Sequence, residues 1–287
     1  MQVVLVKPQG FCGGVSRAIS IANQAKKEHP EALVFVLGAL VNNQTVLDDL
    51  KRNGIETLEG DDEIKLISSL SKGDVIIFSA HGHDEKLDAL AKSLGLIIYD
   101  TTCPKVKENM EKIRRDIKLG HQVIYVGQTN HRETNAALSI SKNISLYDIK
   151  LPFNYYFITD LSPLVINQTT LNYLEINDIH KDILSHIPNA RIENEICSAT
   201  RLRQEAILSI EKDTDLIVIV GDKRSSNTNK LYDIASKNFA HAKVVLVKDL
   251  KELKEIDIKD RKKAAISSGA STPQCVVDEI YNYLLSK

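Results

Sequence analysis

VVLVKPQGFCGGVSRAISIANQAKK, residues 3–27, contains the pattern that the rest of the chain repeats. Its apolar start predicts a strand, its second half predicts a helix, and the glycine-flanked turn between them carries Cys12. Cys103 and Cys197 follow at intervals of 91 and 94 residues, and each again separates a strand-like run from a helix-like run. A thiol at the same joint each time predicts three similar units. Three thiolates from three units can hold one metal or cluster and leave a coordination position open for chemistry.

Short β-branched runs alternate with amphipathic stretches along the whole chain, which indicates α/β units with parallel sheets. The runs that predict strands are residues 3–6, 33–37, 75–78, 96–99, 123–126, 156–158, 216–220 and 244–247. We therefore expect a trefoil of three pseudo-threefold-related α/β units, with small and mostly parallel sheets around a central cluster. The expected units are residues 1–102, 103–196 and 197–287.

Two sets of polar residues recur in step with the cysteines. About 30 residues after each thiol, past the next predicted strand, come Asn42 with Asn43, His131 and Ser225. A second set follows a further strand in each unit and consists of His81, Thr169 and Ser271. Ligand groups in open parallel sheets collect at the carboxyl ends of the strands. Three such edges that face a common centre would form one closed pocket.

The overall charge excludes a bulk polyanionic or membrane partner. Lys plus Arg number 37 and Asp plus Glu number 38, so the net charge is −1 and neither a nucleic-acid surface nor a membrane surface is indicated. The longest apolar runs are far too short to span a bilayer, and the first residues enter a strand pattern directly. We therefore expect a cytoplasmic protein that binds any anionic ligand through a local site.

Four cysteines in a reducing compartment indicate metal ligands, catalytic thiols or core residues before disulfides. Spacing alone does not separate zinc from an iron–sulfur cluster, because the chain contains neither paired CxxC motifs nor a short ferredoxin-like run. Cys275 lies outside the periodic set, and we expect it to be a small packed residue.

Hydroxyl, amide and imidazole groups follow the predicted strands and suit a phosphate ligand. Several of them, together with backbone N–H groups, stand at predicted helix starts, which bind anions. A protonated imidazole at a strand end could pair with phosphate oxygens. The candidate anion ligands are Asn42, His81, His131, Ser225, Ser226, Asn227 and Ser271.

One carboxylate stands beside a histidine at these polar positions. Glu133 lies two residues after His131, which makes it the candidate proton donor. Thr169 is a candidate to orient this carboxyl or to bond a substrate hydroxyl. The cysteines, the candidate anion ligands and Glu133 would together provide a metal centre, an anion site and a proton donor.

Eight motifs in fixed order resemble the 4-hydroxy-3-methylbut-2-enyl diphosphate reductase family of the non-mevalonate isoprenoid pathway. They extend from Cys12 to Thr272 and read GFCGGVSRAI, FSAHG, DTTCP, HRE, QTTL, ICSATRLRQEA, VGDKRSSNTN and SGAST. The resemblance implies a trefoil fold around a [4Fe–4S] cluster held by Cys12, Cys103 and Cys197, whose fourth iron binds the allylic hydroxyl of the substrate. It also implies ferredoxin or flavodoxin as electron donor, and isopentenyl and dimethylallyl diphosphate as products.

The same resemblance implies roles for the polar residues. Glu133 matches the proton donor, with Thr169 beside it. The residues that match diphosphate ligands are His81, His131, Ser225, Ser226, Asn227 and Ser271.

The chain departs from the family pattern at Asn42, where the family usually has histidine. An amide donates a hydrogen bond to phosphate but carries no charge, which costs roughly 1–2 kcal/mol of binding. His83 stands where an apolar residue is usual, and Gln128 replaces a frequent histidine. Two alternatives to the reductase follow: a divergent member with weak or altered use of allylic substrates, and a non-catalytic protein whose three thiolates hold zinc.

Overall fold

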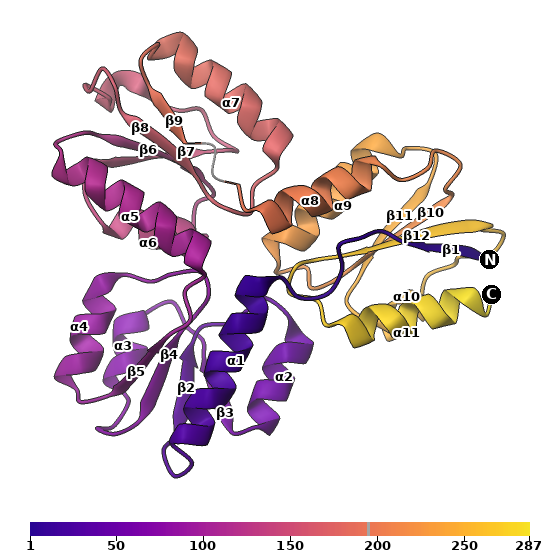
Figure 1. Cartoon of the computed structure of the whole chain (residues 1–287), viewed down its shortest axis with the longest axis horizontal. Helices are drawn as coiled ribbons and strands as arrows, with labels where there is room; N and C mark the ends of the chain where they lie inside the picture. The colour runs from indigo at the N-terminus through magenta and orange to yellow at the C-terminus, as the bar shows by residue number, and fades with distance from the viewer. Residues whose placement is uncertain (194–195) are drawn as a thin grey trace. The chain divides into compact units, whose positions relative to one another are not determined.

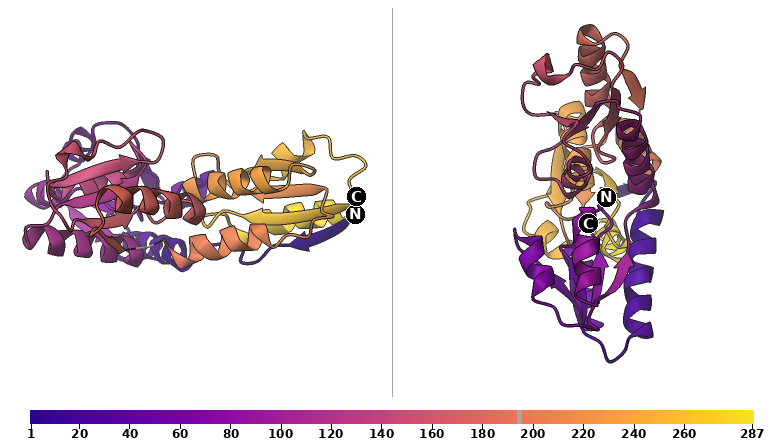
Figure 2. Two further views of the ribbon diagram at one scale, coloured as in Figure 1. Left: turned by 90° about the horizontal axis from the view of Figure 1, so that it is seen from above. Right: turned by 90° about the vertical axis from the view of Figure 1, so that its left-hand side faces the viewer.

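The computed structural model describes residues 1–193 and 196–287, which form three small sheets with helices on their faces (Figures 1 and 2). Each sheet has four strands, and every strand pairing in this described part is parallel. This confirms the predicted α/β class with small parallel sheets. No helix in the described residues is long and apolar enough to cross a membrane.

The chain divides into two compact units. The first contains residues 1–16, 42–46 and 198–287, and the second contains residues 17–41 and 47–197. Helices α1 (Gly13–Glu28) and α2 (Gln44–Arg52) begin in the first unit and continue into the second.

One sheet of the second unit has the strand order β3-β2-β4-β5. Its strands are β2 (Val34–Leu37), β3 (Ile55–Leu58), β4 (Val75–Phe78) and β5 (Ile97–Asp100). The short helices α3 (Glu63–Ser68) and α4 (Glu85–Ser93) cover one face of this sheet. Their apolar side chains pack on Leu37, Ile76 and Phe78, which are almost completely buried. The sheet therefore holds the loop after β4 against a rigid core.

The other sheet of the second unit has the order β7-β6-β8-β9. Its strands are β6 (Val123–Gly127), β7 (Ile144–Asp148), β8 (Leu164–Asn167) and β9 (Arg191–Glu193). Its helices are α5 (Pro104–Lys118), α6 (Arg132–Ser139) and α7 (Tyr173–His186), with a 3₁₀ turn η1 (Tyr155–Phe157). Alternate residues of β6 point to opposite faces: Val123 and Tyr125 pack against α5 and α6, and Ile124 and Val126 against α7.

The sheet of the first unit joins the beginning of the chain to its last third. Its order is β1-β12-β10-β11, with β1 (Gln2–Leu5), β10 (Leu216–Val220), β11 (Lys243–Val247) and β12 (Lys263–Ser268). Helices α8 (Ser198–Leu208) and α9 (Ser226–Asn238) cover one face, and α10 (Leu250–Lys254) and α11 (Gln274–Leu285) the other (Figure 1). The division of the chain after residues 102 and 196 remains a prediction.

Two sequence-based expectations are wrong. Residues 156–158 do not form a strand, because the Asn154 side chain accepts a hydrogen bond from the Tyr156 N–H at 3.0 Å and closes a 3₁₀ turn. Tyr156 and Phe157 are 84% and 65% exposed, so no neighbouring strand covers them. Cys275 is exposed on α11 rather than packed.

Candidate active site

The three periodic cysteines occupy the same local structure. Each stands immediately before a helix, and its backbone N–H donates to the carbonyl of the second residue after a strand. The bonds join Cys12 to Ala270 at 3.0 Å, Cys103 to Ala80 at 3.0 Å, and Cys197 to Thr169 at 3.2 Å. The repeat seen in the sequence is thus a repeat of one strand–turn–helix joint.

This register shifts the second polar set by one residue. Thr169 corresponds to Ala80 and Ala270, so Thr170 is the residue that corresponds to His81 and Ser271. Spacing from the cysteines missed this because the intervals of 69, 66 and 74 residues vary too much between units to fix the register to one residue.

The donor set suits a thiolate-bound metal or cluster. All four cysteines lie in the described chain and none forms a disulfide, while the three periodic ones are half-buried. Among residues 1–193 and 196–287, no three His, Cys, Asp or Glu side chains stand together as a ready-made metal site. The fit therefore depends on the chemistry of the donors: three soft sulfur ligands, each at a helix start.

Glu133 and Thr169, predicted to act together, do lie together. Glu133 is the second residue of α6 and is 1% exposed. Its Oε1 accepts from the Thr169 N–H at 2.9 Å and from the Tyr125 hydroxyl at 3.2 Å. Its Oε2 is 2.9 Å from Thr169 Oγ1. The carboxyl is therefore fixed by groups from β6 and from the loop that follows β8.

Burial raises the pKa of Glu133 to about 7, against the opposing effect of hydrogen bonds from Thr169 and Tyr125, which favour the carboxylate. A carboxyl with this pKa is substantially protonated at neutral pH and can still release its proton. This is the property required of a general acid.

The rings of His81 and His131 are in edge-to-face contact within the second unit, with their centroids 5.8 Å apart and their planes at 81°. His131 caps α6, because its Nδ1 accepts from the Glu133 N–H at 3.2 Å. The Nε2 atom of His81 is buried and has no hydrogen-bond partner in the described structure. A buried polar atom without a partner is unusual and is consistent with a ligand that would complete it.

Burial favours the neutral form of both imidazoles in the described structure. Burial, followed by the charges of His131 and Arg132, lowers the pKa of His81 to about 3. Burial and the Arg132 charge lower the pKa of His131 to about 4. No described carboxylate offsets these effects, so an anionic ligand would have to supply the compensating charge.

The first unit brings most of its polar candidates together. Ser271 Oγ donates to the Asn42 carbonyl at 3.2 Å, and Thr200 Oγ1 donates to Asn227 Oδ1 at 2.9 Å. Ser225 caps α9, immediately before Ser226 and Asn227. The α9 turn and the residue 42 segment therefore belong to the same compact unit.

Asn43, rather than Asn42, has the capping role that His131 and Ser225 have. Its Oδ1 accepts from the Val46 N–H at 3.3 Å and satisfies the first turn of α2. Asn42 is only partly buried and contributes its backbone carbonyl to Ser271.

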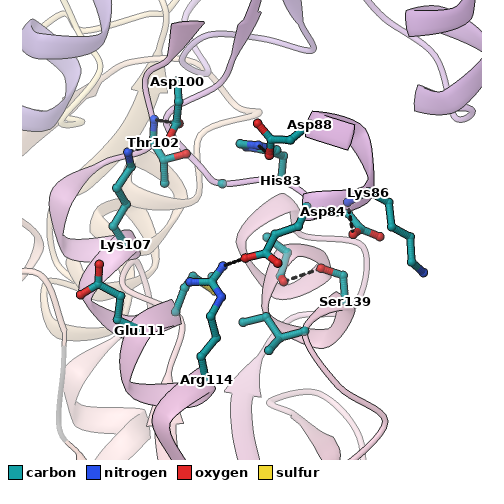
Figure 3. Close-up of a pocket in the computed structure, with 15 residues that line it drawn as sticks. His83, Asp84, Lys86, Asp88, Asp100, Thr102, Lys107, Glu111, Arg114 and Ser139 are labelled. Carbon is teal, nitrogen blue, oxygen red and sulfur yellow. Dashed lines mark hydrogen bonds and ion pairs between the residues drawn. The ribbon is translucent and has the colours of Figure 1, made fainter. Parts of the chain in front are cut away.

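His83 lies in a separate cavity of about 360 Å³ lined by α4, α5 and α6 (Figure 3). Its ring stacks on Phe78 with centroids 3.7 Å apart, and its Nε2 lies 2.6 Å from Asp88 Oδ2. The lining of this cavity includes neither His81 nor His131. The described partners of His83 are therefore Phe78 and Asp88.

Two residues of the site were missed in the sequence. Gln168 is fully buried; its Oε1 accepts from the Gln128 N–H at 3.1 Å and its Nε2 donates to Thr170 Oγ1 at 2.8 Å. Its place before two threonines was the available signal. Tyr125 gave no signal, because strand periodicity marks it only as a core ring.

The sequence matches the model of the LytB protein family over residues 3–285. Relatives from Shouchella clausii and Geobacillus sp. WCH70 are each 35% identical to this chain, cover 99% of it with 90% of their own length, and are 4-hydroxy-3-methylbut-2-enyl diphosphate reductases. A solved E-1-hydroxy-2-methyl-but-2-enyl-4-diphosphate reductase from Plasmodium falciparum is 27% identical, with a TM-score of 0.88 over 99% of this chain and 87% of its own. A solved (E)-4-hydroxy-3-methyl-but-2-enyl diphosphate reductase, the terminal enzyme of the non-mevalonate pathway, is 26% identical with a TM-score of 0.71 over 100% of both chains. Because the family model matches residues 3–285 and these relatives are 35% identical over 99% of the chain, this chain belongs to the LytB protein family.

Proposed function

We propose that the chain reduces 4-hydroxy-3-methylbut-2-enyl diphosphate to isopentenyl and dimethylallyl diphosphate. Two electrons and two protons enter, the allylic C–O bond breaks, and the hydroxyl leaves as water. The observation that carries the proposal is the buried Glu133 carboxyl, which has a pKa of about 7 and is bonded to Thr169. The relatives from Shouchella clausii and Geobacillus sp. WCH70 are reductases of the same substrate, which supports the proposal.

Cys12, Cys103 and Cys197 would hold a [4Fe–4S] cluster, one from each of three units bounded near residues 102 and 196. When bound, the cluster supplies electrons one at a time and a Lewis-acidic iron for the leaving hydroxyl. Ferredoxin or flavodoxin would be the electron donor. The support in this chain is the identical joint at each thiol and the absence of disulfides among them.

The remaining residues would bind the diphosphate and move a proton. His81 and His131 would take up protons as the anion binds, because its negative charge would raise the pKa values that burial has lowered. In the first unit, hydroxyl and amide donors would bind the phosphate oxygens: Asn42, Ser225, Ser226, Asn227 and Ser271. Glu133 would give its proton towards the allylic carbon framework, with Thr169 beside it.

Anaerobic purification followed by iron and sulfide analysis tests the metal assignment. About four irons per chain and broad brown absorption are expected. Cys12→Ser, Cys103→Ser and Cys197→Ser should each lower the iron content. Cys275→Ser should not, because Cys275 lies outside the periodic set and is exposed on α11. A colourless protein that retains zinc would contradict the proposal and favour the non-catalytic alternative.

A further inference from the structure

Tyr125 places a hydroxyl at the centre of an otherwise apolar core. The side chain is 0% exposed and packs in the cluster between the sheet, α5 and α6. A buried tyrosine hydroxyl needs a hydrogen-bond partner, and the partner here is Glu133 Oε1 at 3.2 Å. The only polar atom of this core ring is therefore directed at the candidate acid.

The two oxygens of the Glu133 carboxyl have different partners. Oε1 accepts from the Thr169 N–H, which can only donate, and from the Tyr125 hydroxyl. Oε2 is 2.9 Å from Thr169 Oγ1, a hydroxyl that can accept as well as donate. In the neutral acid, the proton is therefore favoured on Oε2, where it meets an acceptor, and disfavoured on Oε1, where it would meet two donors.

We propose that Tyr125 is a positioning residue that keeps the transferable proton of Glu133 on Oε2, next to the Thr169 hydroxyl. This inference rests on the proposed function, in which Glu133 is the proton donor. The O–H bond at Oε2 breaks, Thr169 Oγ1 receives that proton and releases its own towards the substrate, and Glu133 becomes a carboxylate. The Tyr125 hydroxyl and the Thr169 N–H then stabilise the negative charge at Oε1.

The charges around the carboxyl agree with this role. The hydrogen bond from Tyr125 lowers the pKa of Glu133, while burial and the carboxylate raise the pKa of Tyr125 well above its ordinary value, so the phenol stays protonated. The other titratable neighbours belong to the start of α6: His131 accepts from the Glu133 N–H, and Arg132 is bonded to Glu63. Tyr125 is thus the titratable side chain bonded to the carboxyl in the described chain.

Tyr125→Phe tests the proposal, because it keeps the ring and removes only the hydroxyl. Without this donor the pKa of Glu133 should rise, so the alkaline limb of the kcat profile should move up by about one to two pH units. The KM for the allylic diphosphate should stay unchanged, because the phenol is not placed against substrate. A profile that superimposes on that of the unchanged enzyme would overturn the inference.

Tyr147→Phe is the matched control. Tyr147 lies in β7 of the same sheet, and its hydroxyl also donates to a carboxylate, Asp182 Oδ2, at 3.0 Å. The control should leave the pH profile in place, and an equal shift would show a general effect on the sheet and overturn the inference. Replacing tyrosine with 3-fluorotyrosine, a stronger hydrogen-bond donor, preserves the packing and should shift the Glu133 titration in the opposite direction.

A second readout separates this inference from the proposed function. Infrared difference spectra of the holoprotein follow the carboxylic acid C=O band of Glu133, identified by its loss in Glu133→Gln. This band should titrate at higher pH in Tyr125→Phe, even if no allylic diphosphate is turned over. A wild-type enzyme without turnover would contradict the proposed function, whereas a band that does not shift would contradict only the role of Tyr125.

Discussion

The buried Glu133 carboxyl lowers the free energy of unfolding at neutral and higher pH, and its proposed role as a proton donor explains why such a group is present. Its pKa is about 7 in the folded chain, against an ordinary value of 4.5. Between these pH values the folded protein keeps a proton that the unfolded chain releases. This extra proton stabilises the folded state. Its contribution to the free energy of unfolding is fully present below about pH 4.5 and is lost as the pH rises through about 7, a change of roughly 3 kcal/mol. A residue selected only for packing would not need an ionisable group here.

Glu133→Gln should remove this pH dependence. The amide can accept from Tyr125 and Thr169 through its oxygen and donate to Thr169 Oγ1, so the local bonds can be kept. Urea unfolding at pH 5 and pH 8 should show the variant gaining stability relative to wild type by roughly 2.5 kcal/mol over this range. Glu175→Gln, on an exposed residue in the first turn of α7, is the control and should show no such gain. Parallel stability curves for Glu133→Gln and wild type would contradict the buried-acid account.

Asn42 is one of several neutral groups among the proposed phosphate ligands, and it departs from the family pattern. Asn42→His should lower the KM for the allylic diphosphate by up to about tenfold, because a charged donor strengthens a hydrogen bond to phosphate. Asn42→Gln, which changes length but not charge, should not lower it. A KM that is unchanged or larger in Asn42→His would mean that this position is not part of the diphosphate site.

At the scale of elements, His131 caps helix α6 and Glu133 lies in its first turn. The position of this helix start therefore determines where both side chains lie. Arg132 ties this start to the neighbouring sheet, through the Leu37 carbonyl at 3.3 Å and Glu63 Oε1 at 3.0 Å. The guanidinium fills the space beside Gly38, whose φ of +67° also disfavours any side chain.

Gly38→Ala should therefore be more harmful than an alanine at another left-handed glycine. The methyl group would displace the guanidinium of Arg132 from Leu37 and Glu63 and would also strain the backbone, at a cost of about 1–3 kcal/mol in unfolding free energy. Gly120→Ala is the matched control, because its φ is +88° and nothing lies within 4 Å of the added carbon. Chemical denaturation of both variants compares the two costs, and equal losses would mean that Arg132 does not depend on this space.

The sequence predicted seven of the twelve strands in the described chain and missed β3, β7, β8, β9 and β12, although β8 and β12 are buried at every residue. β4, β6 and β10 are apolar at nearly every residue because sheet neighbours and helices cover both faces. β3, β7 and β9 interrupt their apolar residues with polar ones, so a criterion based on short apolar runs missed them. Tyr156 and Phe157 satisfied the criterion without being buried, because local capping by Asn154 determined their structure.

At the scale of the whole molecule, the period of the cysteines predicted that the same strand–turn–helix joint occurs three times. Each of the three joints has the same backbone hydrogen bond. Glu133 and Thr169 were also predictable, because both follow strands whose carboxyl ends meet. The bond from Tyr125 was not, since burial of a ring does not reveal where its hydroxyl points. The neutral state of His81 was missed for a similar reason: it depends on how deeply the surrounding chain buries the ring.

Anaerobic turnover of 4-hydroxy-3-methylbut-2-enyl diphosphate by the iron-loaded protein, with a chemical reductant, tests the central claim most directly. We expect isopentenyl and dimethylallyl diphosphate from the wild-type protein. Glu133→Gln, with the same iron content, should be slower by a factor of about 10² to 10⁴, as for the loss of a general acid. Equal rates for the two proteins, or no product from an iron-loaded wild type, would contradict the account.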